Sequence, residues 1–172
     1  MTAVNDSARD RAVIRALGEP GDLGWVIQAH GELYAAEFGW NSSFEALVAE
    51  IVAGYARDHD PAREAAWIAT LGDERVGCVF CVRADADAAK LRILLVHPAA
   101  RGHGLGERLV STCLEFARAA GYRRITLWTN SVLASARRIY KALGFELVDE
   151  TPHRSFGQDL VGQTWSRSLQ EQ

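Results

Sequence analysis

Apolar and polar residues follow two periods along this chain, and the periods predict an order of helices and strands. Helical spacing, with apolar positions three or four residues apart, occurs in four segments, at residues 22–38, 44–57, 105–120 and 131–143. Short alternating or continuous apolar runs between them are typical of strands. We predict these strands at residues 11–17, 65–71, 75–83, 90–96, 123–129, 145–150 and 160–169.

The resulting order is β-α-α-β-β-β-α-β-α-β-β, which mixes hairpins with helical crossovers. Such an order predicts an α/β fold with one mixed sheet and helices on both faces. The strand KLRILLV at 90–96 is apolar at consecutive positions near its end, as expected for a central strand that is buried on both sides. No repeat, low-complexity segment or domain boundary interrupts the pattern.

Capping residues set the expected ends of the helices. Asp22 is a suitable N-cap for the first helix, and Ser42 or Ser43 for the second. Gly39 is placed where the first helix should end. The segment TPHRSFGQ at 151–158 is predicted to be a loop between the last two strands.

Composition is ordinary for a globular protein, with 48% hydrophobic and 24% charged residues. No apolar run approaches the length of a membrane span, and the polar start MTAVNDSARD lacks a signal-peptide core. We therefore expect a cytoplasmic protein without a membrane partner. Cys78 and Cys81 lie three apart in a predicted strand and should face opposite sides, so they are expected to be core thiols and no metal site is predicted.

Charge is divided unevenly along the chain. Residues 90–141 contain ten Lys and Arg but only two acidic residues, a net charge of +8, and the rest of the chain carries −11. A basic segment of this kind suits an anionic ligand, and the acidic remainder suggests a cationic one. Scattered surface charge would produce the same sums.

A glycine-rich segment, HPAARGHGLG at 97–106, joins the strand 90–96 to the next helix. Unpaired N–H groups at a helix start bind phosphate, and glycines allow close approach, although a plain turn would also use them. The segment lacks the Lys-Ser/Thr of a P-loop, and Glu107 stands where the dinucleotide fingerprint needs glycine. The pattern that fits is R-x-x-G-x-G.

This pattern resembles the acyl-CoA loop of the GNAT N-acetyltransferase superfamily. LWTNSVLASARRIYKALGF at 127–145 resembles the second half of the same site. The resemblance covers most of the chain and implies a GNAT domain over 11–170, a mostly antiparallel sheet of about seven strands, and an N-terminal tail over 1–10. The stretch GDLGWVIQAHGELYAAEFGW further resembles the acetyltransferase half of proteins fused to a MarR-like winged helix. The chain has no winged helix, so no nucleic-acid partner is implied.

The resemblance implies acetyl-CoA as co-substrate. A bulge would part the strand 90–96 from its neighbour and leave its backbone to pair with the pantetheine arm, while the glycine loop would bind the pyrophosphate. Asn130 would contact the arm near the thioester, or it caps the following helix. The implied cofactor-binding residues are Leu94, Leu95, Val96, Arg101, Gly102, His103, Gly104, Leu105, Gly106, Asn130 and Tyr140.

The same resemblance implies acetyl transfer to a primary amine, on a small molecule or peptide, by direct attack in a ternary complex. Tyr140 would protonate the departing thiolate, although a tyrosine on a helix is more often packing. Glu37 is our first choice of base and His153 the second; a helix end emerging into water would equally explain Glu37 and His30. We expect Tyr34, Glu37, Trp40 and His153 to contact the acceptor.

Trp128, at the end of its strand, is expected in the core. Cys113 is expected on the inner, apolar face of its helix, which disfavours a route through a covalent acetyl-cysteine. From the charge division we expect a cationic acceptor. A non-catalytic acyl-CoA sensor is the alternative function, and a homodimer is left open.

Overall fold

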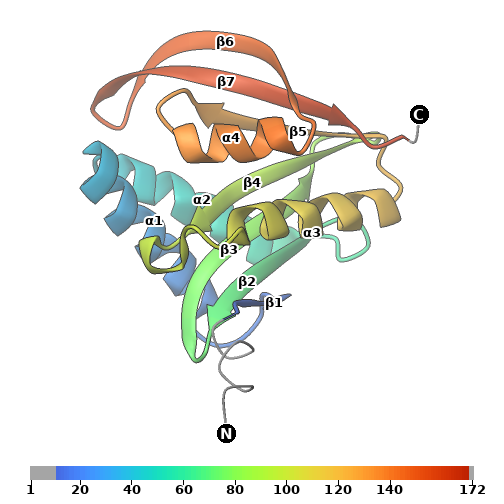
Figure 1. Ribbon diagram of the computed structural model, residues 1–172, viewed down its shortest axis with the longest axis horizontal. Coiled ribbons are helices and arrows are strands. Elements are labelled where there is room, and N and C mark those ends of the chain that lie inside the picture. Colours follow the sequence, from blue (N-terminus) through green and yellow to red (C-terminus); the bar gives the residue numbers. More distant parts are fainter. Residues whose placement is uncertain (1–10, 171–172) are drawn as a thin grey trace, which may run out of the picture.

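Seven strands form one sheet, and helices cover both of its faces (Figure 1). The computed structural model describes residues 11–170, so the predicted tail 1–10 lies outside the described residues. The strands are β1 (Val13–Ala16), β2 (Ala65–Leu71), β3 (Glu74–Arg83), β4 (Ala88–Val96), β5 (Arg124–Asn130), β6 (Glu146–Ser155) and β7 (Gln158–Ser168). Their spatial order is β1-β2-β3-β4-β5-β7-β6. All neighbours are antiparallel except β4 and β5, which confirms the mixed, mostly antiparallel sheet.

The helices divide between two cores on opposite faces of the sheet. Helices α1 (Asp22–Phe38) and α2 (Ser42–Asp58) cover one face, and α3 (Leu105–Ala119) and α4 (Ala134–Ala142) cover the other. A short 3-10 turn, η1 (Pro98–Ala100), precedes α3. Among residues 11–170, no helix is both long and apolar enough to cross a membrane. The predicted inner stripe of α3 is confirmed, because Leu105, Leu109 and Cys113 are all buried.

Strand parity assigns the cysteines to different cores. Cys78 packs under α1 and α2, and Cys81 packs with Cys113 on the α3 side. All three thiols are free and buried, as expected for core residues. Burial raises the pKa of the Cys78 thiol, so this side chain stays protonated.

Helix starts differ from the predictions because side chains have other partners. The N-cap of α2 is Asn41, whose side chain accepts from the Ser43 N–H at 3.0 Å, in place of either serine. The N-cap of α1 is Gly21, and Asp22 is the first helical residue. Asn130 does not cap α4, which begins only at Ala134 after Leu133.

The last two strands form one long hairpin without the predicted loop. Residues 151–155 continue β6, and the turn before β7 contains only Phe156 and Gly157. The segment TPHRSFGQ resembles a loop because most of its residues are polar. β6 is the edge strand and most of its residues are exposed. Its sequence therefore lacks the alternation of apolar and polar residues by which a strand is predicted.

The parallel pair β4–β5 opens part of the way along its length. Pairing runs from Ala88–Arg124 to Leu91–Leu127 and then stops, although both strands continue. At the same level the β3–β4 register shifts, and Ile93 adopts a φ of 43°. A bulge of this kind bends the strand. Beyond Leu91 the two strands therefore diverge, and the backbone of β4 is left without a partner on that side.

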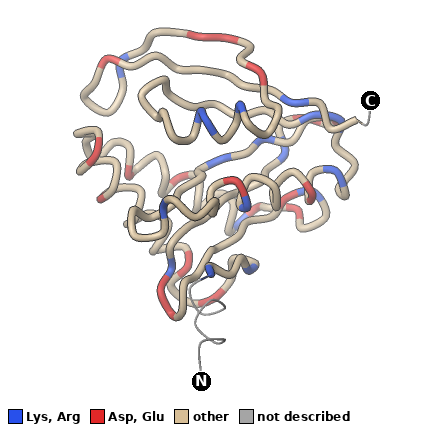
Figure 2. The backbone as a smooth tube through the Cα atoms, in the orientation of Figure 1, with Lys and Arg blue, Asp and Glu red and all other residues tan. Residues whose placement is uncertain are grey.

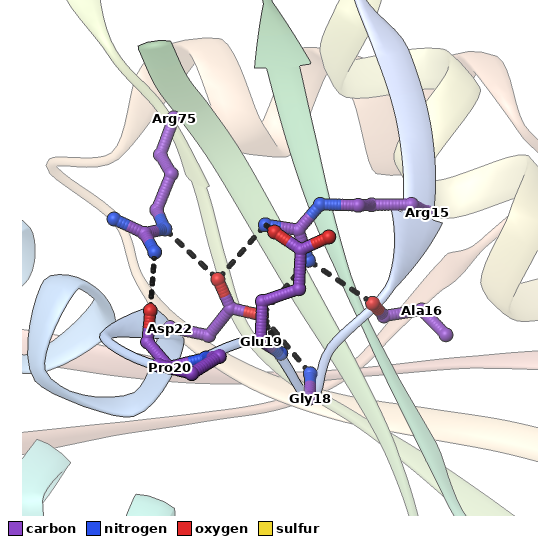
Figure 3. Close-up of polar contacts among 7 residues, drawn as sticks. All are labelled: Arg15, Ala16, Gly18, Glu19, Pro20, Asp22 and Arg75. Carbon is purple, nitrogen blue, oxygen red and sulfur yellow. Dashed lines mark hydrogen bonds and ion pairs between the residues drawn. The ribbon is translucent and has the colours of Figure 1, made fainter. Parts of the chain in front are cut away.

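The start of α1 is fixed to the sheet by a buried carboxylate. Figure 3 shows Asp22 between the guanidinium groups of Arg15 on β1 and Arg75 on β3. Its oxygens lie 2.8 and 2.9 Å from Arg15 and 2.8 Å from Arg75, and they accept the N–H groups of Gly18 and Glu19. The side chain is fully buried. Hydrogen bonds from Arg15 are the largest cause holding the pKa of Asp22 far below its usual range.

We expect Asp22→Ala to lower the free energy of unfolding by about 2–4 kcal/mol at pH 7, because Arg75 would lose its carboxylate partner and Arg15 would keep only the more exposed Glu19. Asp58→Ala breaks an exposed ion pair with Arg57 and should cost less than about 1 kcal/mol. Urea denaturation measures both changes. Since the pKa of folded Asp22 is depressed, its contribution is full above the unfolded pKa of about 3.9 and is lost as pH falls below it. A gap between wild type and Asp22→Ala that does not shrink in acid would contradict this.

Candidate functional site

Two hollows lie on either side of the opening between β4 and β5. A cleft of about 700 Å³ lies between the end of β4, the start of α3, and α4. A smaller cavity of about 200 Å³ lies on the α1–α2 side of the sheet. Tyr34, Leu94, Leu133 and Ala136 line both hollows. The two spaces therefore meet where the strands diverge.

The glycine loop presents a helix start to the larger cleft. Gly104, the N-cap of α3, has a φ of 74°, and a side chain there would meet no protein atom within 4 Å. The Arg108 N–H bonds to the Gly104 carbonyl at 3.1 Å. The N–H groups that precede it in the first turn have no partner within the helix. They form a concentrated, partly positive donor group suited to an anion.

Arg101 stands beside these donors and is held by two contacts. Its guanidinium lies 2.6 Å from a carboxylate oxygen of Glu37 and donates to the Val96 carbonyl at 3.2 Å. Glu37 therefore lies at the larger cleft, at the end of α1, and does not line the smaller cavity. This differs from the expected place of Glu37 beside the acceptor, because the last turn of α1 reaches across to the glycine loop.

Most of the residues predicted to bind cofactor line the larger cleft, with three exceptions. The eight that line it are Leu94, Leu95, Val96, Arg101, Gly102, Gly104, Leu105 and Gly106. His103 instead lines a shallow depression beside Val13 and Ile14. Asn130 and Tyr140 line the smaller cavity.

Tyr140 reaches the smaller cavity from α4 and is 4% exposed. Its ring contacts Phe145. Among the described residues, its hydroxyl makes no side-chain hydrogen bond. Burial is the main cause that raises the pKa of Tyr140, so the hydroxyl keeps its proton throughout the physiological range.

Asn130 and His153 form a polar pair beside the cavity. The Asn130 Oδ1 lies 2.7 Å from His153 Nε2, and His153 Nδ1 lies 2.9 Å from Ser155 Oγ. His153 packs against Trp128 and does not itself line the cavity. Trp128 is 47% exposed and lines the cavity, so its expected place in the core is wrong. The pairing of β5 with β4 ends one residue before Trp128, at Leu127.

Aromatic side chains from α1, α2 and the β6–β7 turn form one wall of the smaller cavity. Tyr34, Trp40, Phe44 and Phe156 pack against one another with centroids 4.6 to 5.0 Å apart. The structure thus brings Tyr34 and Trp40, two of the four residues that we expect to contact the acceptor, to this cavity. The segments around Trp40 and around Phe156 meet here.

His30 also borders this cavity, so the alternative in which it emerges into water at a helix end is wrong. It is 1% exposed because Phe44 and Tyr34 pack against its ring. Burial lowers the pKa of His30 to about 4, so the ring is neutral at physiological pH. Its Nδ1 lies 2.7 Å from the Val26 carbonyl and must carry the proton, since a carbonyl only accepts.

Two basic residues on the cavity floor were not predicted from the sequence. Lys90 and Arg92 of β4 line the cavity, and none of its lining residues among the described part of the chain is acidic. This cavity therefore does not offer the acidic surroundings that a cationic acceptor would need, and the expected cationic acceptor stays a prediction. Figure 2 shows acidic residues on β6 and at the β2–β3 turn, near opposite ends of the molecule. The signal that the sequence offered was the presence of two charged residues, two positions apart, in a strand predicted to be buried on both sides.

A split mixed sheet, with a glycine-rich helix start on one side of the split, defines an acetyltransferase fold. The model of the acetyltransferase (GNAT) family matches residues 27–145, more than half of the chain. The chain belongs to this family. Within residues 11–170, no group of three or more His, Cys, Asp or Glu side chains could hold a metal ion.

Individual relatives agree with this family. N-acetylaspartate synthetase of Danio rerio is 33% identical over 105 residues, covering 60% of this chain and 36% of that protein. Human N-acetyltransferase 8B is 34% identical over 85 residues, covering 46% and 37%. The chain spans less than two-fifths of the length of these relatives. Neither is described as a winged-helix fusion, so that narrower resemblance stays a prediction.

The solved structure of yncA, a putative acetyltransferase from Salmonella typhimurium with acetyl-CoA, superposes with a TM-score of 0.72. The match covers 94% of this chain and 95% of that one at 20% identity. At this identity the likeness establishes a shared fold.

Proposed function

We propose that this protein is an acetyl-CoA-dependent N-acetyltransferase that acts on a primary amine by direct attack in a ternary complex. The observation that carries the proposal is the junction of the two hollows at the β4–β5 opening. One hollow offers an anion-binding helix start, and the other offers a buried hydroxyl donor. The related yncA structure, which contains acetyl-CoA, supports the choice of co-substrate.

In this proposal the larger cleft binds the coenzyme. The first N–H groups of α3 and the Arg101 guanidinium neutralise the pyrophosphate. The backbone of Leu94 to Val96, which has no strand partner on the β5 side, pairs with the amides of the pantetheine arm, as an added strand would. We assign Glu37 a positioning role through Arg101, since its carboxylate is in contact with that guanidinium.

The junction of the hollows is where the acyl group would be transferred. When bound, acetyl-CoA supplies an acyl group activated as a thioester. Attack of a neutral amine forms the new C–N bond, the C–S bond breaks, and Tyr140 donates its hydroxyl proton to the departing sulfur. The proton that the nitrogen then loses returns to the Tyr140 oxygen, directly or through water, so that the products are the amide and the free CoA thiol. Asn130, held by His153, positions the arm near this point. Cys113 lies in the α3 core and lines neither hollow, which favours direct transfer over an acetyl-cysteine route.

The proposed function is tested in two measurements on the wild-type chain. Calorimetry measures binding of CoA, and a thiol reagent measures CoA released from acetyl-CoA over a panel of amines. We expect micromolar-range binding and amine-dependent release. Binding without release for any amine would support the acyl-CoA sensor, while absence of binding would exclude both functions.

A further inference from the structure

Lys90 and Arg92 are two positive charges placed together on the floor of the smaller cavity. They are two residues apart on β4, so their side chains leave the same face of the sheet. Arg92 pairs with Phe80, whose ring lies in the core under α1 and α2. Both residues are partly buried. Within residues 11–170, neither forms an ion pair within 4 Å, whereas Arg15, Arg75 and Arg101 each have a carboxylate partner.

Neighbouring cations without a counter-charge are unfavourable in partly buried surroundings. Burial lowers the pKa of Arg92, and burial together with Arg92 lowers that of Lys90. The other titratable groups that line the cavity are His30, Tyr34 and Tyr140, all of which are neutral at physiological pH because burial shifts their pKa values away from the charged form. The cavity therefore lacks a negative charge of its own, and a bound ligand can supply it.

We propose that the acceptor is a small amino carboxylate whose carboxylate binds Lys90 and Arg92 while its amine faces the junction beside Tyr140. This inference rests on the proposed function and specifies its substrate. Arg92 lies two residues along β4 from Leu94, roughly 7 Å, so its long side chain can reach a carboxylate close to the amine. The aromatic wall opposite suits an apolar side chain on the acceptor.

The size of the cavity agrees with a small acceptor. At about 200 Å³ it is below the roughly 300–1,000 Å³ of pockets that hold drug-sized ligands. A guanidinium recognises a carboxylate through paired, charge-assisted hydrogen bonds. A lone amine gains nothing from this floor, since an ammonium would be repelled by it.

The same charges remove the need for a carboxylate base. A nearby cation lowers the pKa of an ammonium by disfavouring its charged form. The bound acceptor would release its proton to water more readily, and the resulting lone pair on nitrogen could then attack. The carboxylate of the acceptor offsets part of this lowering of the ammonium pKa. Two cations lower the pKa more than one would, so both Lys90 and Arg92 contribute.

Matched acceptors test the inference directly. We would compare the kcat/KM of wild type for phenylalanine, leucine, their carboxamides and phenethylamine, from the rate of CoA thiol release. We expect the acids to be preferred over their amides by about tenfold or more, the scale of a charged hydrogen bond. The amides have the lower amine pKa, so greater availability of neutral amine cannot produce this preference.

Variants separate the carboxylate contact from other effects. Arg92→Gln and Lys90→Met should each raise KM for the acids about tenfold and leave KM for the amides unchanged. Arg57→Gln, which removes an exposed arginine at the end of α2, is the charge-matched control and should change neither value. Calorimetry with CoA confirms that each variant is folded and that the coenzyme cleft is intact.

The outcomes distinguish this inference from the proposed function. Transfer to amides or simple amines in preference to acids, or an equal effect of Arg92→Gln on acids and amides, would overturn the carboxylate proposal alone. CoA binding without transfer to any amine would overturn the proposed function, and the acceptor assignment with it.

Discussion

Tyr140→Phe is expected to lower kcat by about 10²-fold while leaving the affinity for CoA unchanged. The substitution removes one oxygen and keeps the ring that packs against Phe145. A group that donates a proton only as the C–S bond breaks affects the chemical step, and general acids typically contribute about 10²- to 10⁴-fold. Steady-state kinetics gives kcat, and calorimetry gives the affinity.

Tyr122→Phe is the matched control for Tyr140→Phe. Tyr122 is equally buried in the same core, and its hydroxyl donates to the Arg63 carbonyl at 2.8 Å, far in sequence from the cleft. Its loss should reduce stability by about 1 kcal/mol and leave kcat intact. If Tyr140→Phe kept full turnover with its best acceptor, Tyr140 would be a packing residue and another group or water would protonate the sulfur.

Gly104→Val should weaken CoA binding by roughly 10- to 100-fold. Since a Cβ at position 104 would have no protein atom within 4 Å, the new side chain would occupy the space in front of the α3 donors. Losing one charge-assisted hydrogen bond to a phosphate costs about 1.5–3 kcal/mol, which corresponds to this change in affinity. Calorimetric titration with CoA measures it.

Backbone strain also accompanies Gly104→Val, because valine disfavours the φ of 74°. Gly72→Val separates the two effects. Gly72 lies in the β2–β3 turn with a φ of 60°, and a Cβ there also meets nothing within 4 Å. Both variants should be less stable in thermal unfolding, but only Gly104→Val should lose affinity for CoA. Equal affinities would show that the loop does not bind the pyrophosphate.

Arg101 and Glu37 illustrate how a predicted site residue can have a different role in the fold. Both were expected at the site, one for the cofactor and one for the acceptor. The 2.6 Å contact between them places Glu37 with the cofactor cleft. Which cavity a residue near the end of α1 faces depends on how far the helix reaches over the sheet, and its helical period carries no such information.

Local features were predictable because their causes are local. Period alone predicted the order of all the helices and strands, since amphipathic segments must bury one face. The glycine-rich loop predicted a helix start that a ligand can approach closely, and a Cβ at Gly102 or Gly104 would indeed meet nothing within 4 Å, because left-handed dihedrals and close approach favour glycine. The opposite faces of Cys78 and Cys81 followed from strand parity.

Long-range features were decided only by the tertiary structure. Lys90 and Arg92 share a face of β4 because they lie two residues apart, but only the divergence of β4 from β5 and the packing of α2 make that face part of a cavity. His30 was ambiguous until Phe44 on a different helix covered it. Charge summed along the chain suggested a cationic acceptor, but it gave no sign that Lys90 and Arg92 line a cavity whose described lining holds no acidic residue, because electrostatic interactions depend on distances in space that the chain order does not fix.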